Sequence, residues 1–185
     1  MKRINDRFTW AANLCAGRVV LDIGGVGAGV CIEDNPYYRA MSVIRKTPSV
    51  YRTADIKPEA DIHVDLNSRL AIDELVENAK DYDIVMMMEV IEHTPLGGYL
   101  LTRLSELNIS MIVTLPANDN WVLNALRWDY DHVCGFTKST AYRFVERACK
   151  NRNYVYTPLI GKYTKMWIPV YLLSGKPISH GFYIP

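Results

Sequence analysis

The sequence predicts an α/β domain built on a mainly parallel β-sheet with helices on both faces. Short apolar runs rich in β-branched residues recur along the chain, as expected of strands that are buried on both sides. Polar segments able to form helices lie between most of these runs. The first run ends in a glycine-rich turn, which lets a ligand approach the backbone closely.

Five apolar runs are predicted to form the parallel strands. Each is short and β-branched, which favours a strand over a buried helix. They cover residues 18–23, 49–56, 61–64, 82–88 and 109–115. Residues 154–173 are rich in Tyr, Val, Ile and Trp and contain Gly161, so they are predicted to form a closing antiparallel pair of strands.

Helices are predicted most firmly over residues 66–80 and 137–152, where apolar positions recur with a period near 3.6 residues. In the first segment these positions are Leu70, Ile72, Leu75, Val76 and Ala79. Thr137 is the expected N-cap of the second segment. Residues 30–46 predict a broken or late-starting helix because Pro36 interrupts them, and residues 1–17 have room for one small helix.

Length and composition indicate one domain spanning residues 1–185. The chain has 185 residues, of which 49% are hydrophobic, enough for one sizeable core. A formal net charge of +1 provides no global field to attract nucleic acid or a membrane. No segment is long and apolar enough to span a membrane, and no signal peptide or obligate protein partner is evident. The four cysteines form no CxxC pair, so we expect reduced thiols in a cytoplasmic protein.

The glycine-rich turn at residues 22–29 is the first functional signal. It contains Asp22, Gly24, Gly25 and Gly27, but Val30 stands where the dinucleotide pattern GxGxxG requires its third glycine. The stretch Val20 to Gly29 resembles the first motif of class I S-adenosylmethionine-dependent methyltransferases, although its glycines are spaced as if one residue had been inserted. This resemblance implies a Rossmann-like fold and a cofactor held by these four residues.

Two further carboxylates match cofactor-binding positions of that family. Asp55 ends the second predicted strand, where the resemblance implies an acceptor for the two ribose hydroxyls. Asp65 follows the third strand, at a position similar to the acidic residue beside the adenine. Asp65 or Asn67 could instead cap the next helix. The resemblance covers about residues 18–150 and includes the segments 82–93 and 112–118, so it implies that Glu89 also shapes the cofactor pocket.

A metal site is also indicated. If the chain turns helical after the fourth strand, the spacing of Glu89, Glu92 and His93 places all three on one face, and His132 could supply a fourth ligand. This set resembles metal-dependent O-methyltransferases that modify the 3′-terminal ribose of small RNAs and, in part, those of the ubiquinone pathway. The resemblance implies a divalent ion such as Mg or Mn and a catalytic histidine, His93 or His132. The alternative is that the chain resembles members of the superfamily that bind no metal, in which this stretch mainly shapes the cofactor pocket.

The resemblance implies transfer of the methyl group of S-adenosylmethionine. The acceptor of this methyl group is predicted only as a class, a hydroxyl-bearing small molecule or RNA. Basic and aromatic residues interleave near the C-terminus and could meet phosphates and bases, but the same residues also fit an edge strand. The loop 117–136 could wall a substrate pocket. Two alternatives remain open: a binding protein that has kept the fold without turnover, and a nicotinamide-dependent oxidoreductase, which the failed glycine pattern disfavours.

Overall fold

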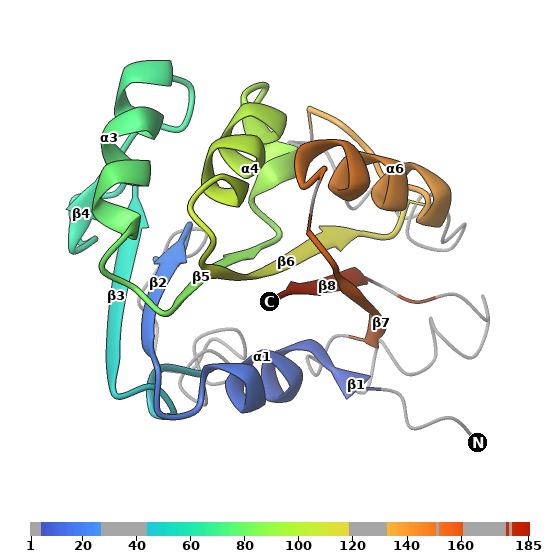
Figure 1. The fold of residues 1–185 in the computed structure, drawn as a ribbon, viewed down its shortest axis with the longest axis horizontal. Helices are drawn as coiled ribbons and strands as arrows, with labels where there is room; N and C mark the ends of the chain where they lie inside the picture. The colour runs from blue at the N-terminus through green and yellow to red at the C-terminus, as the bar shows by residue number, and fades with distance from the viewer. Residues whose placement is uncertain (1–4, 27–43, 119–132, 151, 161–176, 178) are drawn as a thin grey trace.

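The computed structural model describes residues 5–26, 44–118, 133–150, 152–160, 177 and 179–185. All eight described strands belong to one sheet, in the order β1-β7-β8-β6-β5-β2-β3-β4 (Figure 1). The strands are β1 (Asn5–Asp6), β2 (Val19–Ile23), β3 (Val50–Asp55), β4 (Ile62–His63), β5 (Ile84–Met88), β6 (Ser110–Pro116), β7 (Val155–Ile160) and β8 (Ser179–Ile184). Every pairing is parallel except the two made by β8.

The five predicted parallel strands are confirmed as β2 to β6. A closing antiparallel pair of strands is present, as predicted. Its second strand, however, lies at Ser179–Ile184 and not within residues 154–173. This strand pairs with both β6 and β7 and is buried, yet it includes Ser179, His180 and Gly181 and so lacks the apolar pattern of a buried strand. Residues 161–173 fall outside the described ranges.

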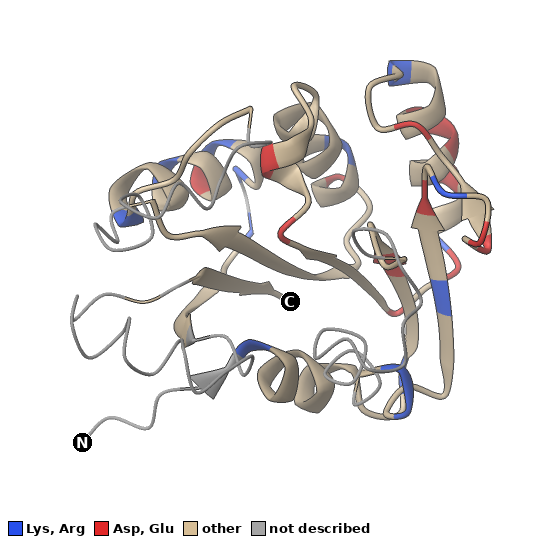
Figure 2. Ribbon diagram, turned by 180° about the vertical axis from the view of Figure 1, so that it is seen from behind, with Lys and Arg blue, Asp and Glu red and all other residues tan. Residues whose placement is uncertain are grey.

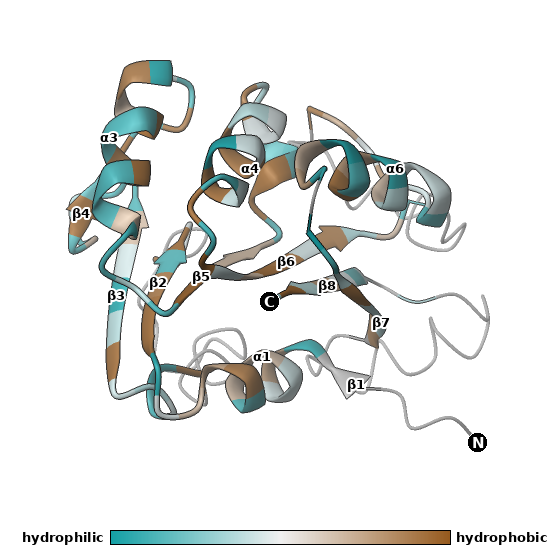
Figure 3. Cartoon of the chain, in the orientation of Figure 1, coloured by the Kyte–Doolittle hydropathy of each residue, from teal (hydrophilic) through white to brown (hydrophobic). Residues whose placement is uncertain are grey.

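Helices cover both faces of the sheet, as predicted. On one face, α1 (Arg7–Cys15) packs its buried side on Val20, Met86 and Ile112. The other face carries α3 (Arg69–Ala79), α4 (Gly97–Ser105) and α6 (Lys138–Ala148), which lie side by side in Figure 1. Charged residues of both signs lie on the helices and at strand ends (Figure 2), whereas the central strands β2 and β5 are mostly apolar (Figure 3).

The helix ends follow local sequence signals. Thr137 caps α6 as predicted, because its side chain accepts a hydrogen bond from the Thr140 amide and Thr140 bonds back to the Thr137 amide. Ser68, and neither Asp65 nor Asn67, caps α3. Leu70 is 70% exposed and does not belong to the apolar face predicted for α3. The segment 30–46 lies largely outside the described residues.

Within the described ranges, no helix has the length and apolar character that crossing a membrane requires. That residues 1–185 form a single domain stays a prediction.

One ionisable side chain is buried in the middle of the sheet. Asp22, in β2, is 1% exposed and accepts a hydrogen bond from the Tyr51 hydroxyl on the neighbouring β3. Burial raises the pKa of the Asp22 carboxyl to about 7, although the Tyr51 hydrogen bond and the charge of Arg45 oppose this rise and Asp55 adds to it. The fold therefore favours the protonated form of this carboxyl.

This burial predicts a pH-dependent stability. Between about pH 4, where an unfolded Asp ionises, and about pH 7, the folded chain holds a proton that the unfolded chain has lost. The contribution of Asp22 is thus fully present below that window and is lost as the pH rises through it. In Asp22→Asn, the free energy of unfolding, measured by urea denaturation, should fall less over this window than in the wild type. Parallel pH profiles for the two proteins would contradict the assignment.

Candidate functional site

The candidate site lies at the edge of the sheet where β2, β3 and β5 end. From β2 the chain proceeds to β3 and β4 on one side, while β5 and β6 lie on the other side. Open α/β sheets bind ligands at such a reversal of strand order, outside the carboxyl ends of the strands. The loops after β2, β3 and β5 are therefore the segments to consider.

The turn after β2 packs against the loop after β5. Gly24 has a φ of 76° and donates its amide to the carbonyl of Ala54 at 2.7 Å. A Cβ at Gly24 would lie 2.5 Å from a methyl group of Val90, and a Cβ at Gly25 would lie 2.6 Å from the Asp22 carboxylate. Gly24 thus lets the turn meet the loop after β5, and Gly25 lets the turn close over Asp22. Gly27 lies outside the described residues, and the cofactor contacts expected of these glycines stay predictions.

Asp55 joins this turn to the end of β3. One carboxylate oxygen accepts the amide of Val26 and the other accepts the amide of Lys57, each at 3.2 Å. The residue is half-buried. An ionised carboxylate has about four acceptor positions, so these two bonds leave room for two hydroxyl donors. Asp55 is thus oriented by the backbone and still able to bind a diol.

Asp65 lies at the same edge, in the turn that precedes α3. Its carboxylate accepts the amide of Asn67 at 2.9 Å and the Asn67 side chain at 3.1 Å. The Thr94 hydroxyl donates to the carbonyl of Leu66 at 2.9 Å, which ties this turn to the loop after β5. The predicted role of Asp65 beside an adenine remains a prediction.

Glu89 faces α1 and forms an ion pair there. It has a φ of 56°, and its amide donates to the carbonyl and hydroxyl of Thr114. Its carboxylate lies 3.6 Å from the guanidinium of Arg7, and the two side chains are 21% and 14% exposed. Among the described residues, neither the buried Nε atom of Arg7 nor the buried Oε1 atom of Glu89 has a hydrogen-bond partner. A buried guanidinium with an unused donor is suited to an anionic ligand group.

Sequence reasoning missed Arg7. A positive residue that opens a helix is unfavourable for the helix dipole, and this was the signal available. Its pairing with Glu89 depends on a contact between segments far apart in the sequence, which no local pattern predicts.

Glu92 and His93 belong to the 3₁₀ turn η1 (Ile91–His93). Glu92 is fully buried, the His93 side chain is 38% exposed, and its Nε2 atom lies 3.9 Å from a Glu92 carboxylate oxygen. Glu89 precedes this turn and faces Arg7, so the three side chains do not share one helical face as the spacing suggested. Among the described residues, no three His, Cys, Asp or Glu side chains are grouped to hold a metal.

The remaining predicted ligand, His132, lies outside the described residues. The next residue, Val133, donates its amide to the carbonyl of Glu92 at 2.7 Å. Farther along, the Asn118 side chain accepts the amide of Phe136 at 2.8 Å. The segment that follows His132 is thereby held against η1 and against the end of β6.

No family model matches the chain, but curated relatives do. The ubiquinone biosynthesis O-methyltransferase of Nitrobacter winogradskyi is 33% identical over 125 residues, which cover 65% of this chain and 47% of that protein. The enzyme of the same name from Rhodopseudomonas palustris strain HaA2 is 37% identical over 127 residues, which cover 65% and 48%. The chain spans about half the length of these relatives.

Solved structures share the fold. The small RNA methyltransferase HEN1 has a TM-score of 0.60 at 16% identity, over 100% of this chain and 27% of that chain. An S-adenosylmethionine-dependent methyltransferase from Mesorhizobium loti has a TM-score of 0.58 at 7% identity, over 96% of this chain and 95% of that chain. Together with the strand order and the antiparallel β8, these similarities show that the chain has the fold of the class I S-adenosylmethionine-dependent methyltransferases.

Proposed function

We propose that the chain binds S-adenosylmethionine at the carboxyl edge of β2, β3 and β5 and transfers its methyl group to a hydroxyl oxygen of a small molecule or RNA. The observation that carries this proposal is the junction at Gly24, where the turn after β2 packs on the loop after β5 and Asp55 holds the turn from β3. The relatives named O-methyltransferases support oxygen as the acceptor atom.

The polar groups of the edge fit the two ends of this cofactor. Asp55 has acceptor positions left for the ribose hydroxyls, and Arg7 has a buried donor that suits the carboxylate of the methionine part. Because Arg7 already faces Glu89, a second carboxylate near this guanidinium would share its charge. We therefore assign Glu89 the role of orienting Arg7 as well as lining the pocket.

The chemistry requires positioning and one proton acceptor. When bound, S-adenosylmethionine supplies an electrophilic methyl group, whose S–C bond breaks as the acceptor oxygen forms a new O–C bond. The acceptor hydroxyl gives up its proton, and we assign this proton to a histidine, His93 or His132. The His93 side chain is 38% exposed at the edge of the site, and its Nε2 atom lies 3.9 Å from a Glu92 carboxylate oxygen.

We also propose that a divalent ion, Mg or Mn, binds among Glu89, Glu92, His93 and His132, and that the histidine which accepts the proton is not one of its ligands. Carboxylate oxygens and imidazole nitrogens suit these ions. Glu92 and His93 are close to each other, and the bond from Val133 brings the residue after His132 to Glu92. Glu89 would have to exchange its partner Arg7 for the ion. Such an ion would orient neighbouring hydroxyls of the acceptor and lower the pKa of one of them.

Cofactor binding is tested with Asp55→Ala. Removing the acceptor of two ribose hydroxyls should weaken S-adenosylmethionine binding by roughly tenfold or more, as titration calorimetry would show. Glu59→Ala removes the same charge from the same loop, where Glu59 is exposed, and should bind like the wild type. Equal affinity of Asp55→Ala and wild type would refute the ribose assignment. Absence of binding to the wild type would refute the proposed function.

The metal is tested separately with His132→Ala. Calorimetric titration with Mn²⁺ should show saturable binding to the wild type that weakens at least tenfold in the variant, while S-adenosylmethionine affinity stays nearly unchanged. His63→Ala is the matched control, because His63 is exposed on β4 at the far edge of the sheet. A wild type that is indifferent to Mn²⁺, or a variant that binds it equally well, would remove the ion from the proposal.

A further inference from the structure

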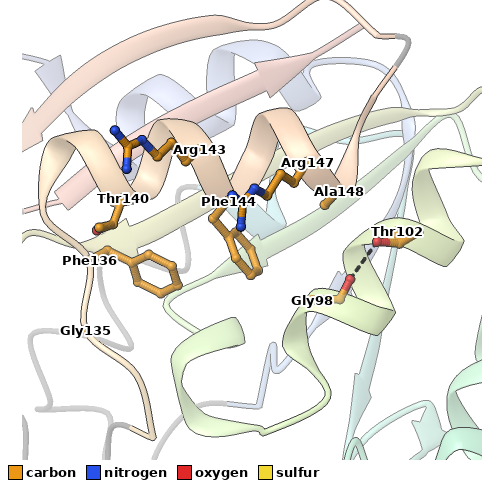
Figure 4. A pocket seen from close by; sticks show the side chains of 9 residues that line it. All are labelled: Gly98, Thr102, Gly135, Phe136, Thr140, Arg143, Phe144, Arg147 and Ala148. Atoms are coloured by element: carbon orange, nitrogen blue, oxygen red, sulfur yellow. Dashed lines mark hydrogen bonds between the residues drawn. The ribbon is translucent and has the colours of Figure 1, made fainter.

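A groove of about 450 Å³ runs between α4 and α6 on the outer side of the helical layer (Figure 4). Its lining includes Phe136 and Phe144, the glycine Gly98 at the start of α4, and two arginines of α6, Arg143 and Arg147. None of these residues belongs to the cofactor site described above. The groove therefore needs an explanation of its own.

The base of the groove is aromatic. The rings of Phe136 and Phe144 meet edge to face, with their centroids 5.1 Å apart. Phe136 is buried, whereas Phe144 is only partly covered. A Cβ at Gly98 would meet the Phe144 ring at 3.5 Å, an ordinary contact, so the absence of a side chain there leaves the ring open to the groove. An uncovered aromatic ring offers a flat surface on which a planar group can stack.

The charge of the groove is positive. Arg143 and Arg147 lie one turn apart on α6, both exposed, and the lining includes no acidic residue. Within the described part of the chain, neither guanidinium has an ion-pair partner. Glu146 is the one acidic residue of α6, and basic residues are spread along that helix (Figure 2). Two unpaired guanidinium groups above an aromatic surface are complementary to phosphate groups that carry planar bases.

One end of the groove lies next to η1. Gly98 follows Gly97, where a Cβ would lie 2.5 Å from the carbonyl oxygen of Ile91, so the start of α4 packs directly on η1. On the opposite wall, Gly135 and Phe136 continue the segment that Val133 anchors to the carbonyl of Glu92. Two segments that line this end of the groove are therefore packed on or bonded to η1, the turn that contains His93.

We propose that the α4–α6 groove binds the phosphodiester backbone of a single-stranded nucleic acid whose end is the methyl acceptor. This inference rests on the proposed function and selects nucleic acid from its two acceptor classes. Arg143 and Arg147 contact phosphates, and the Phe144 ring stacks on a base. A net charge of +1 for the whole chain agrees with attraction that is local to the groove.

The test is fluorescence anisotropy of a labelled oligouridylate at low salt, with and without two independent changes. In Arg143→Gln/Arg147→Gln, affinity should fall about tenfold or more, and the slope of log affinity against log salt should decrease by about 1.4, or 0.7 for each lost phosphate contact. Gly98→Gln keeps the charge but fills the groove and should also weaken binding. A glutamine is tolerated there because Gly98 does not have a positive φ and a Cβ would make only an ordinary contact of 3.5 Å with the Phe144 ring.

The matched control is Lys46→Gln/Lys80→Gln, which removes two exposed positive charges that do not line the groove and should leave oligouridylate affinity nearly unchanged. The proposal is overturned if the wild type does not bind oligouridylate, if the arginine variant binds it as tightly as the wild type, or if inorganic phosphate competes as well as the strand. S-adenosylmethionine affinity, measured separately by calorimetry, should be the same in all four proteins. If the wild type bound oligouridylate but not S-adenosylmethionine, the proposed function would be rejected and the groove assignment would stand.

Discussion

The site depends on one close approach, between Gly24 at the end of β2 and Val90 after β5. A side chain at position 24 would lie 2.5 Å from a Val90 methyl group, and the residue adopts a φ of 76°, which side-chain-bearing residues rarely adopt. The parallel pairing of β2 with β5 brings these two strand ends to the same level. Because Gly24 also bonds the carbonyl of Ala54, a single glycine joins the ends of β2, β3 and β5.

Four carboxyl groups lie around this junction in different environments. Asp22 is buried beneath the turn, where its pKa is raised, while Asp55 remains half-buried with two backbone amides directed at it. On the other side of the junction, Glu89 pairs with Arg7 from α1, and Glu92 is buried beside His93. Carboxylates of different exposure and partners thus surround one small region. We propose different roles for them: Asp22 supports the turn, Asp55 binds hydroxyls and Glu89 orients Arg7.

The sequence predicted what depends on neighbours along the chain and missed what depends on distant contacts. The buried run at Val19–Ile23 and the Thr137 cap are encoded locally, so both were foreseen. Strand β8 was placed too early because the first half of Ser179–Ile184 is polar and is buried only by its two partner strands. Arg7 escaped notice because only the packing of α1 brings it to Glu89. The common face expected for Glu89, Glu92 and His93 failed because the helical turn begins only at Ile91.

The central claim is that the junction at Gly24 forms the cofactor site, and Gly24→Ala tests it most directly. Gly17→Ala is the matched control, because Gly17 has a similar φ of 70° but nothing within 4 Å of its would-be Cβ. Both variants should lose about 1–2 kcal/mol of stability from the unfavourable φ, and Gly24→Ala should lose more because its Cβ would lie 2.5 Å from a Val90 methyl group. In calorimetry at a temperature where both are folded, only Gly24→Ala should lose affinity for S-adenosylmethionine. Wild-type affinity in Gly24→Ala, or an equal loss in Gly17→Ala, would contradict the account.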